Sequence, residues 1–107
     1  MTHVIVTRKA SHIVLVESKG HTGYAEEGND IVCSALSTVL QTALLGLIKV
    51  AKVNVTSDIS DGYLRFELPE DMSEEERRTS DNILETMLVG VEDLSQGLSK
   101  YIKLEVK

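Results

Sequence analysis

The sequence is poor in the residues that build disulfide-linked or aromatic cores. It has 107 residues with one cysteine and no tryptophan, and aromatic residues make up only 4% of it. A single cysteine cannot form an internal disulfide, which fits a cytoplasmic protein. The core must be aliphatic, and a chain of this length can bury such a core without cross-links. We therefore expect one domain over residues 1–107.

An excess of basic residues is also missing. Lys plus Arg number 11 and Asp plus Glu number 17, so the net charge is −6. This balance argues against direct binding of nucleic acid, which needs a basic face opposite the phosphates. The acidic excess suits a basic partner or only aids solubility, and charge alone leaves both interpretations open.

Long apolar runs are scarce. Residues 1–12 lack the apolar segment of a signal peptide. The segment Ile31–Ile48 carries no charge, but small and polar residues dilute it, and it barely reaches the length of a membrane span. We therefore expect a helix buried in protein and no membrane association. The diluting residues are Ser34, Ser37, Thr38, Gln41, Thr42 and Gly46.

Metal ligands are few and scattered. One cysteine and three histidines do not make the four-ligand set of a structural zinc site. We expect no metal and no other cofactor. His3 and His12 fall in predicted strands, where roles in the core or at the surface are expected for them.

Two pairs of strand patterns are present. Residues 2–7 and 12–18 are β-branched runs separated by a short polar segment, and they predict a hairpin. Residues 54–60 and 63–68 predict a second hairpin. Its turn would be Asp61–Gly62, which supplies the positive φ angles of a tight two-residue turn.

A helix pattern follows each hairpin. Asn29 or Asp30 can cap a helix that runs to about Val50. A second helix begins at the capping box Ser73–Glu76 and continues with a wide apolar stripe. Residues 101–106 alternate like a final strand. The order ββαββαβ predicts an α+β domain, with helices packed on a mainly antiparallel or mixed sheet.

The stretch Gly20–Ser37 brings the chain's only thiol to a helix start. If Asp30 is the cap, Cys33 is the third helical residue, where the helix dipole and free N–H groups favour the thiolate. His21 lies twelve residues upstream on a glycine-rich loop and could act as general base. The same N–H groups could hold a developing oxyanion. The alternative is a small, buried, unreactive cysteine.

A dense motif runs through this stretch. It consists of Gly20, His21, Gly23, Tyr24, Gly28, Asp30, Ile31, Val32, Cys33 and Ser37. The motif resembles the signature of the bacterial ribosomal-processing cysteine protease (Prp) family. Thr22 departs mildly from it, since a small residue is expected there.

The resemblance implies a cytoplasmic endopeptidase with Cys33 as nucleophile and His21 as base. Such enzymes remove the N-terminal extension of large-subunit ribosomal protein number twenty-seven and form homodimers. Asp30 and Ser37 match family positions as candidate supporting residues. Gly20, Gly23, Tyr24 and Gly28 are candidates for a substrate-binding or lid loop.

Two rival hypotheses remain at this point. One is a non-catalytic, ribosome-associated adaptor that binds a basic ribosomal protein through its acidic surface. The other is a redox-sensing thiol, for which the chain supplies no second cysteine as a resolving partner.

Overall fold

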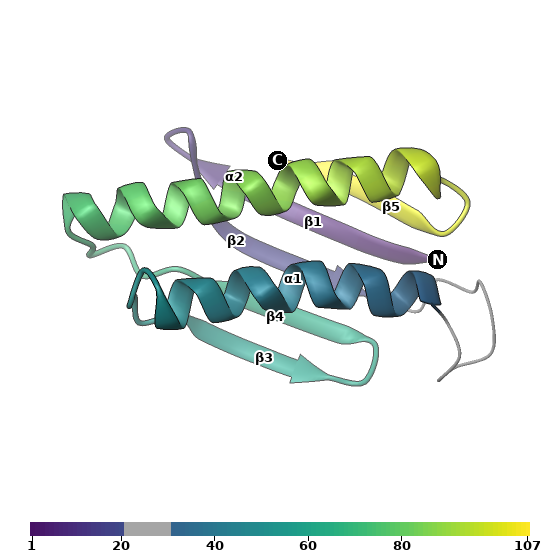
Figure 1. Cartoon of the computed structure of the whole chain (residues 1–107), viewed down its shortest axis with the longest axis horizontal. Helices are drawn as coiled ribbons and strands as arrows, with labels where there is room; N and C mark the ends of the chain where they lie inside the picture. The colour runs from purple at the N-terminus through teal and green to yellow at the C-terminus, as the bar shows by residue number, and fades with distance from the viewer. Residues whose placement is uncertain (21–30) are drawn as a thin grey trace.

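The computed structural model describes residues 1–20 and 31–107. Their elements follow the predicted order ββαββαβ (Figure 1). They are β1 (Thr2–Lys9), β2 (His12–Lys19), α1 (Ile31–Lys49), β3 (Thr56–Ser60), β4 (Tyr63–Glu67), α2 (Glu74–Gly97) and β5 (Ile102–Val106). The predicted α+β class is confirmed, and the element boundaries differ from the predicted ones by only one or two residues.

The five strands form one mixed sheet in the order β3-β4-β2-β1-β5. β1 pairs antiparallel with β2, and β4 pairs antiparallel with both β2 and β3. β5 lies parallel to β1, with Thr2 opposite Ile102 and Val6 opposite Val106. A parallel neighbour requires a long crossover connection, and α2 provides it.

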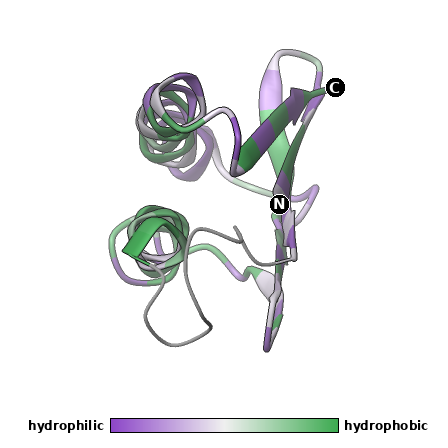
Figure 2. Cartoon of the chain, turned by 90° about the vertical axis from the view of Figure 1, so that its right-hand side faces the viewer, coloured by the Kyte–Doolittle hydropathy of each residue, from purple (hydrophilic) through white to green (hydrophobic). Residues whose placement is uncertain are grey.

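Both helices cover the same face of the sheet (Figure 2). Along β1 the residues facing the helices, Thr2, Val4 and Val6, are buried, and the residues between them are only partly buried. The core joins this face to the inner sides of both helices and is aliphatic apart from Phe66. The expectation of an aliphatic core is confirmed.

The β3–β4 turn differs from the predicted backbone pattern. In the β3–β4 turn Gly62 has a φ of +69°, but among the described residues positive φ outside glycine occurs only at Ala10, Ser11 and Lys52. The prediction of positive φ at Asp61 is therefore wrong. In this turn the glycine alone adopts the left-handed conformation, which costs it nothing because it has no Cβ. Ala10 and Ser11 adopt it in the β1–β2 turn.

The helix α1 is long and apolar enough to cross a membrane by length and composition, and a third of its apolar window is buried. In this fold its inner face belongs to the domain core, beside α2. Its buried residues are Val32, Leu36, Leu40, Ala43, Leu44 and Leu47. The composition of α1 therefore fits a core helix with one exposed, uncharged face.

Candidate active site

Cys33 lies in the first turn of α1 and is partly buried. No acidic side chain is present in the described first turn of this helix. The free backbone N–H groups of a helix start favour a thiolate over a thiol. No neighbouring carboxylate in that turn opposes this effect. The predicted position of the thiol at a helix start is therefore what the structure shows.

A cavity of about 100 Å³ opens between α1 and the β3–β4 hairpin, next to Cys33. We call it the strand-side hollow. Apolar side chains from both walls meet in it, and Ile59 on the edge strand β3 is still half exposed. The lining residues are Thr2, Ser18, Gly20, Cys33, Leu36, Ser37, Leu40, Gln41, Ile59, Ser60, Gly62, Tyr63 and Leu64.

A second, more open depression of about 460 Å³ runs along the outer side of α1. We call it the helix-side hollow. Cys33, Ser37 and Gln41 belong to both hollows, and we call these three residues the polar ridge. They recur every four residues, so they lie on one face of the helix. The other lining residues are Ser34, Thr38, Thr42 and Leu45.

A direct side-chain bond joins two residues of the polar ridge. The Gln41 Nε2 group donates to Ser37 Oγ at 2.8 Å. Ser37 follows Cys33 by one helical turn, so the predicted proximity of Ser37 to the thiol is consistent with the geometry. The supporting role of Ser37 stays a prediction.

Gly20 is a fixed part of the strand-side hollow. Its φ is +93°, and a Cβ at this position would lie 2.7 Å from the Met1 carbonyl oxygen. The Gly20 N–H donates to the Gly62 carbonyl at 2.8 Å, and Thr2 Oγ1 donates to the Gly20 carbonyl at 3.3 Å. Only glycine fits this backbone conformation and this space. Gly20 thereby joins the end of β2 to the β3–β4 turn.

Five residues of the motif lie outside the described residues. These are His21, Gly23, Tyr24, Gly28 and Asp30. The pairing of His21 with Cys33, the cap at Asp30 and the proposed loop roles therefore stay predictions.

The two described histidines lie away from the hollows. His12 is 2.8 Å from the Asp81 carboxylate, through which β2 contacts α2. His3 is 3.4 Å from the Glu105 carboxylate, and its strand neighbours Thr2 and Val4 face the opposite side of the sheet. These surroundings agree with surface roles for both. Within residues 1–20 and 31–107, no group of three His, Cys, Asp or Glu residues could hold a metal ion.

Sequence reasoning had not identified three lining residues, Gln41, Ile59 and Tyr63. Gln41 could have been found, because it repeats the four-residue spacing of Cys33 and Ser37 along one helix face. Ile59 and Tyr63 could not, because the β3–β4 hairpin approaches α1 only through the order of strands in the sheet.

A thiol in the first turn of a helix, between two hollows, suits a cysteine nucleophile. The comparisons with known proteins agree. The family model described as cysteine protease Prp matches residues 1–103. A ribosomal processing cysteine protease Prp from Bacillus subtilis is 33% identical, with 92% of each chain covered.

Solved structures give the same result. The Staphylococcus aureus ribosomal processing protease Prp, crystallised with a covalently linked product peptide, superposes with a TM-score of 0.88 at 25% identity, over all of both chains. A Streptococcus mutans protein superposes with a TM-score of 0.81 at 26% identity, over 99% of this chain and 93% of the other. The chain belongs to the Prp cysteine protease family, and it is a cysteine-type endopeptidase.

Proposed function

We propose that this enzyme removes the N-terminal extension of large-subunit ribosomal protein number twenty-seven in the cytoplasm, with Cys33 as nucleophile and His21 as general base. The observation that carries the proposal is the position of Cys33 in the first turn of α1, where both hollows meet. The name of the Bacillus subtilis relative supports ribosomal processing. The product peptide linked to the Staphylococcus aureus relative supports a peptide as the ligand.

The chemistry follows from a helix-start thiolate. His21 accepts the proton of Cys33 Sγ, and the sulfur attacks the carbonyl carbon of the scissile peptide bond. Backbone N–H groups at the start of α1 hold the negative oxygen that forms. The imidazolium then protonates the departing amine, which leaves a thioester on Cys33. A water molecule gives a proton to His21 and attacks the thioester, releasing the carboxyl product and restoring the thiol.

The substrate is an extended, flexible tail that passes over Cys33. The strand-side hollow offers apolar surface from Leu36, Leu40 and Ile59 for a side chain next to the cut. Tyr24 is a further candidate wall of this pocket. The net charge of −6 speeds the encounter with a basic ribosomal protein, because long-range attraction acts mainly on association rate.

The decisive test is incubation of the enzyme with the precursor protein, followed by intact-mass measurement of both products. Wild-type enzyme releases one N-terminal fragment. Cys33→Ala and His21→Ala each lose nearly all activity, since general-base help alone is typically worth about 10²–10⁴ in rate. A well-folded Cys33→Ala protein that cuts the precursor at the wild-type rate would contradict the mechanism. Full function of this variant in cells would instead favour the adaptor hypothesis.

The exposed apolar surface of the helix layer supports a homodimer as part of the proposal. A depression of about 590 Å³ lies between α1 and α2, and Val50 at its edge is 68% exposed. A second copy placed there by a two-fold axis would cover this surface. Its lining residues are Thr38, Val39, Thr42, Ala43, Gly46, Val50, Asn82, Ile83, Thr86 and Met87.

Sedimentation at micromolar concentration tests the dimer. Val50→Asp would place a charge in the interface and is expected to shift the protein to the monomer. Val106→Asp, an exposed apolar position on β5 outside this depression, is the matched control and should leave the dimer intact. Wild-type protein that sediments only as a monomer would argue against this assembly.

A further inference from the structure

The exposed face of α1 has an unusual composition for a helix surface. From Ile31 to Ile48 it carries no charged side chain, although exposed helix positions are commonly occupied by charged residues. The helix-side hollow follows this face from Cys33 to Leu45. Between these ends it presents only hydroxyl groups and one carboxamide, that of Gln41. These are neutral groups that hydrogen-bond without selecting a charge.

Gln41 is the member of this surface with the most hydrogen-bonding capacity. One N–H of its amide is used by Ser37 Oγ at 2.8 Å. Within the described residues, the bond to Ser37 is the one that fixes the Gln41 amide. It leaves the Oε1 acceptor and a second N–H of the amide for a ligand. An adjacent acceptor and donor match the N–H and C=O groups that an extended peptide presents along its edge.

The bond to Ser37 also sets where this amide lies relative to the thiol. Long helical side chains point back toward the helix N-terminus, and this bond holds the Gln41 amide at the level of Ser37. Ser37 follows Cys33 by four residues, which is about 6 Å along the helix axis. An extended peptide advances about 3.4 Å per residue. The amide therefore lies about two peptide residues away from the bond that Cys33 attacks.

We propose that Gln41 is a substrate-recognition residue, whose carboxamide binds the main chain of the peptide about two residues from the scissile bond. This inference rests on the proposed peptidase function of the same site. Gln41 lies on the polar ridge that both hollows share, so a peptide that runs parallel to the helix axis from Cys33 passes it. Because the bond is to the main chain, it holds the register of the substrate without reading its side chains.

Steady-state kinetics on a peptide that spans the cut give the first test. Gln41→Ala should raise KM by roughly 3- to 10-fold, the range of one net hydrogen bond. It should change kcat by less than about 2-fold, because the bond is the same in bound substrate and in the transition state. Gln96→Ala removes the chain's other glutamine, an exposed residue near the end of α2, and should change neither value.

A set of ester-substituted peptides tests the position of the contact. Each peptide replaces one backbone N–H near the cut, other than that of the scissile bond, by an ester oxygen. The wild-type KM should rise for the ester two residues from the cut, and the Gln41→Ala KM should be insensitive to that ester. This is the non-additivity expected when the two changes remove the same bond.

The outcomes separate this inference from the function on which it rests. If wild-type enzyme cuts the peptide and Gln41→Ala has the wild-type KM, only the recognition role is overturned. The same holds if every ester affects both enzymes equally. If wild-type enzyme cuts neither precursor nor peptide, the proposed function fails. Binding of the uncut peptide to Cys33→Ala protein, with and without Gln41→Ala, then still decides the recognition role, which an unchanged Kd would overturn.

Discussion

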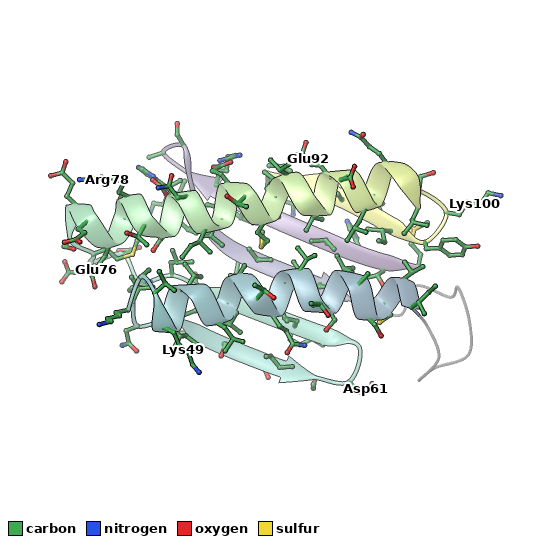
Figure 3. The ribbon with its side chains drawn as sticks, in the orientation of Figure 1. Lys49, Asp61, Glu76, Arg78, Glu92 and Lys100 are labelled. Atoms are coloured by element: carbon green, nitrogen blue, oxygen red, sulfur yellow. The ribbon has the colours of Figure 1, made fainter. Side chains whose placement is uncertain are left out.

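The helices α1 and α2 lie side by side on the same face of the sheet but differ in almost every other respect. α2 carries charged side chains along its length, among them Glu76, Arg78 and Glu92 (Figure 3). Lys49 is the only charged residue of α1 and lies at its far end, away from Cys33. Charge is thus concentrated on the helix that does not carry the thiol.

The polar contacts follow the same division. α2 begins with a complete capping box, and its carboxylates at Asp81 and Glu85 pair with His12 and Arg8 on the sheet. α1 presents hydroxyls and an amide instead. Both helices bury apolar faces in the core, and the difference lies in their polar surfaces. α2 pairs its charges with the sheet, whereas α1 has an uncharged surface around the thiol.

The largest effect on stability is expected from the core side of α2. Leu84 is fully buried, so Leu84→Ala should lower the free energy of unfolding by about 2–5 kcal/mol, through lost burial and a cavity. Leu45→Ala on α1 is the control for burial, because this side chain is half exposed, and it should cost less than about 0.5 kcal/mol. Urea titration measures both. Equal losses would show that burial does not set the cost.

The next largest effect is expected at the start of α2. Ser73 Oγ accepts the Glu76 N–H at 3.1 Å, and the Ser73 N–H donates to Glu76 Oε1 at 2.7 Å. Ser73→Ala should cost about 1 kcal/mol. Activity at a temperature where the variant is folded should be unchanged, because the start of α2 lies at the opposite end of the helix layer from the start of α1, which carries the thiol (Figure 1). Loss of activity without loss of stability would contradict the division between the helices.

The pH dependence of this cap has a defined sign. The bond from the Ser73 backbone N–H, and then its hydroxyl, hold the pKa of Glu76 below its ordinary value. The contribution of the cap is therefore fully present above the ordinary glutamate pKa and is lost as the pH falls through the lower folded value. Ser73→Ala should only reduce this acid-side slope, because its backbone N–H still donates to Glu76, whereas Glu76→Gln should remove it. A pH dependence of stability unchanged by Glu76→Gln would show that the carboxylate does not contribute.

A smaller effect is expected from an acidic residue in the first turn of α1, a feature that the first turn of α2 already has. Ser34→Glu adds an acid to the first turn of α1, which should stabilise the helix by about 0.3–1 kcal/mol. The same charge next to Cys33 should raise the pKa of the thiol, because like charges disfavour the thiolate. Alkylation by iodoacetamide at pH 7 should then slow several-fold. Thr38→Glu, one turn further, is the control and should slow it less.

Sequence patterns predicted the helices and strands because their periodicity is local. The hairpins and the capping box at Ser73–Glu76 appear at the predicted places, within one or two residues. The strand order was not predicted, because it depends on β5 crossing over to lie beside β1. Local reasoning also misassigned the backbone of Asp61, since either of two turn conformations suits its dipeptide.

The same distinction between local and long-range structure applies to the candidate site. The position of Cys33 followed from one helix start, and Ser37 followed from helical spacing. Ile59 and Tyr63 form the opposite wall of the strand-side hollow and belong to the β3–β4 hairpin, which is distant from Cys33 in sequence. The pairing of β4 with β2 in the sheet places this hairpin opposite α1. The role of His21 rested on its place in a glycine-rich loop upstream of the thiol and on the resemblance to a known family, and it stays a prediction.

The smallest effect is expected from the ion pair between α2 and β1. Arg8 donates to Glu85 from Nη1 and Nη2, the two terminal guanidinium nitrogens, and Nη2 lies 3.0 Å from Oε1. Both side chains remain substantially exposed. The bond from Arg8 lowers the pKa of Glu85, so its contribution is present above the ordinary glutamate pKa and is lost as the pH falls below it. Solvent screening limits this contribution, and a double-mutant cycle of Arg8→Ala and Glu85→Ala should give a coupling of about 0.2–1 kcal/mol.

The salt and pH dependence of this coupling energy shows whether it is electrostatic. It should shrink when the ionic strength is raised to 1 M, where exposed charges are screened within about 3 Å. It should also shrink as the pH falls below the ordinary glutamate pKa and Glu85 takes up a proton. Lys9→Ala with Glu70→Ala provides the matched cycle for a more exposed pair at 3.4 Å, and its coupling should be close to zero. A salt-independent coupling between Arg8 and Glu85 would show that the two side chains act through packing. The contrast between a charged α2 and a neutral α1 would then rest on the capping box and not on this ion pair.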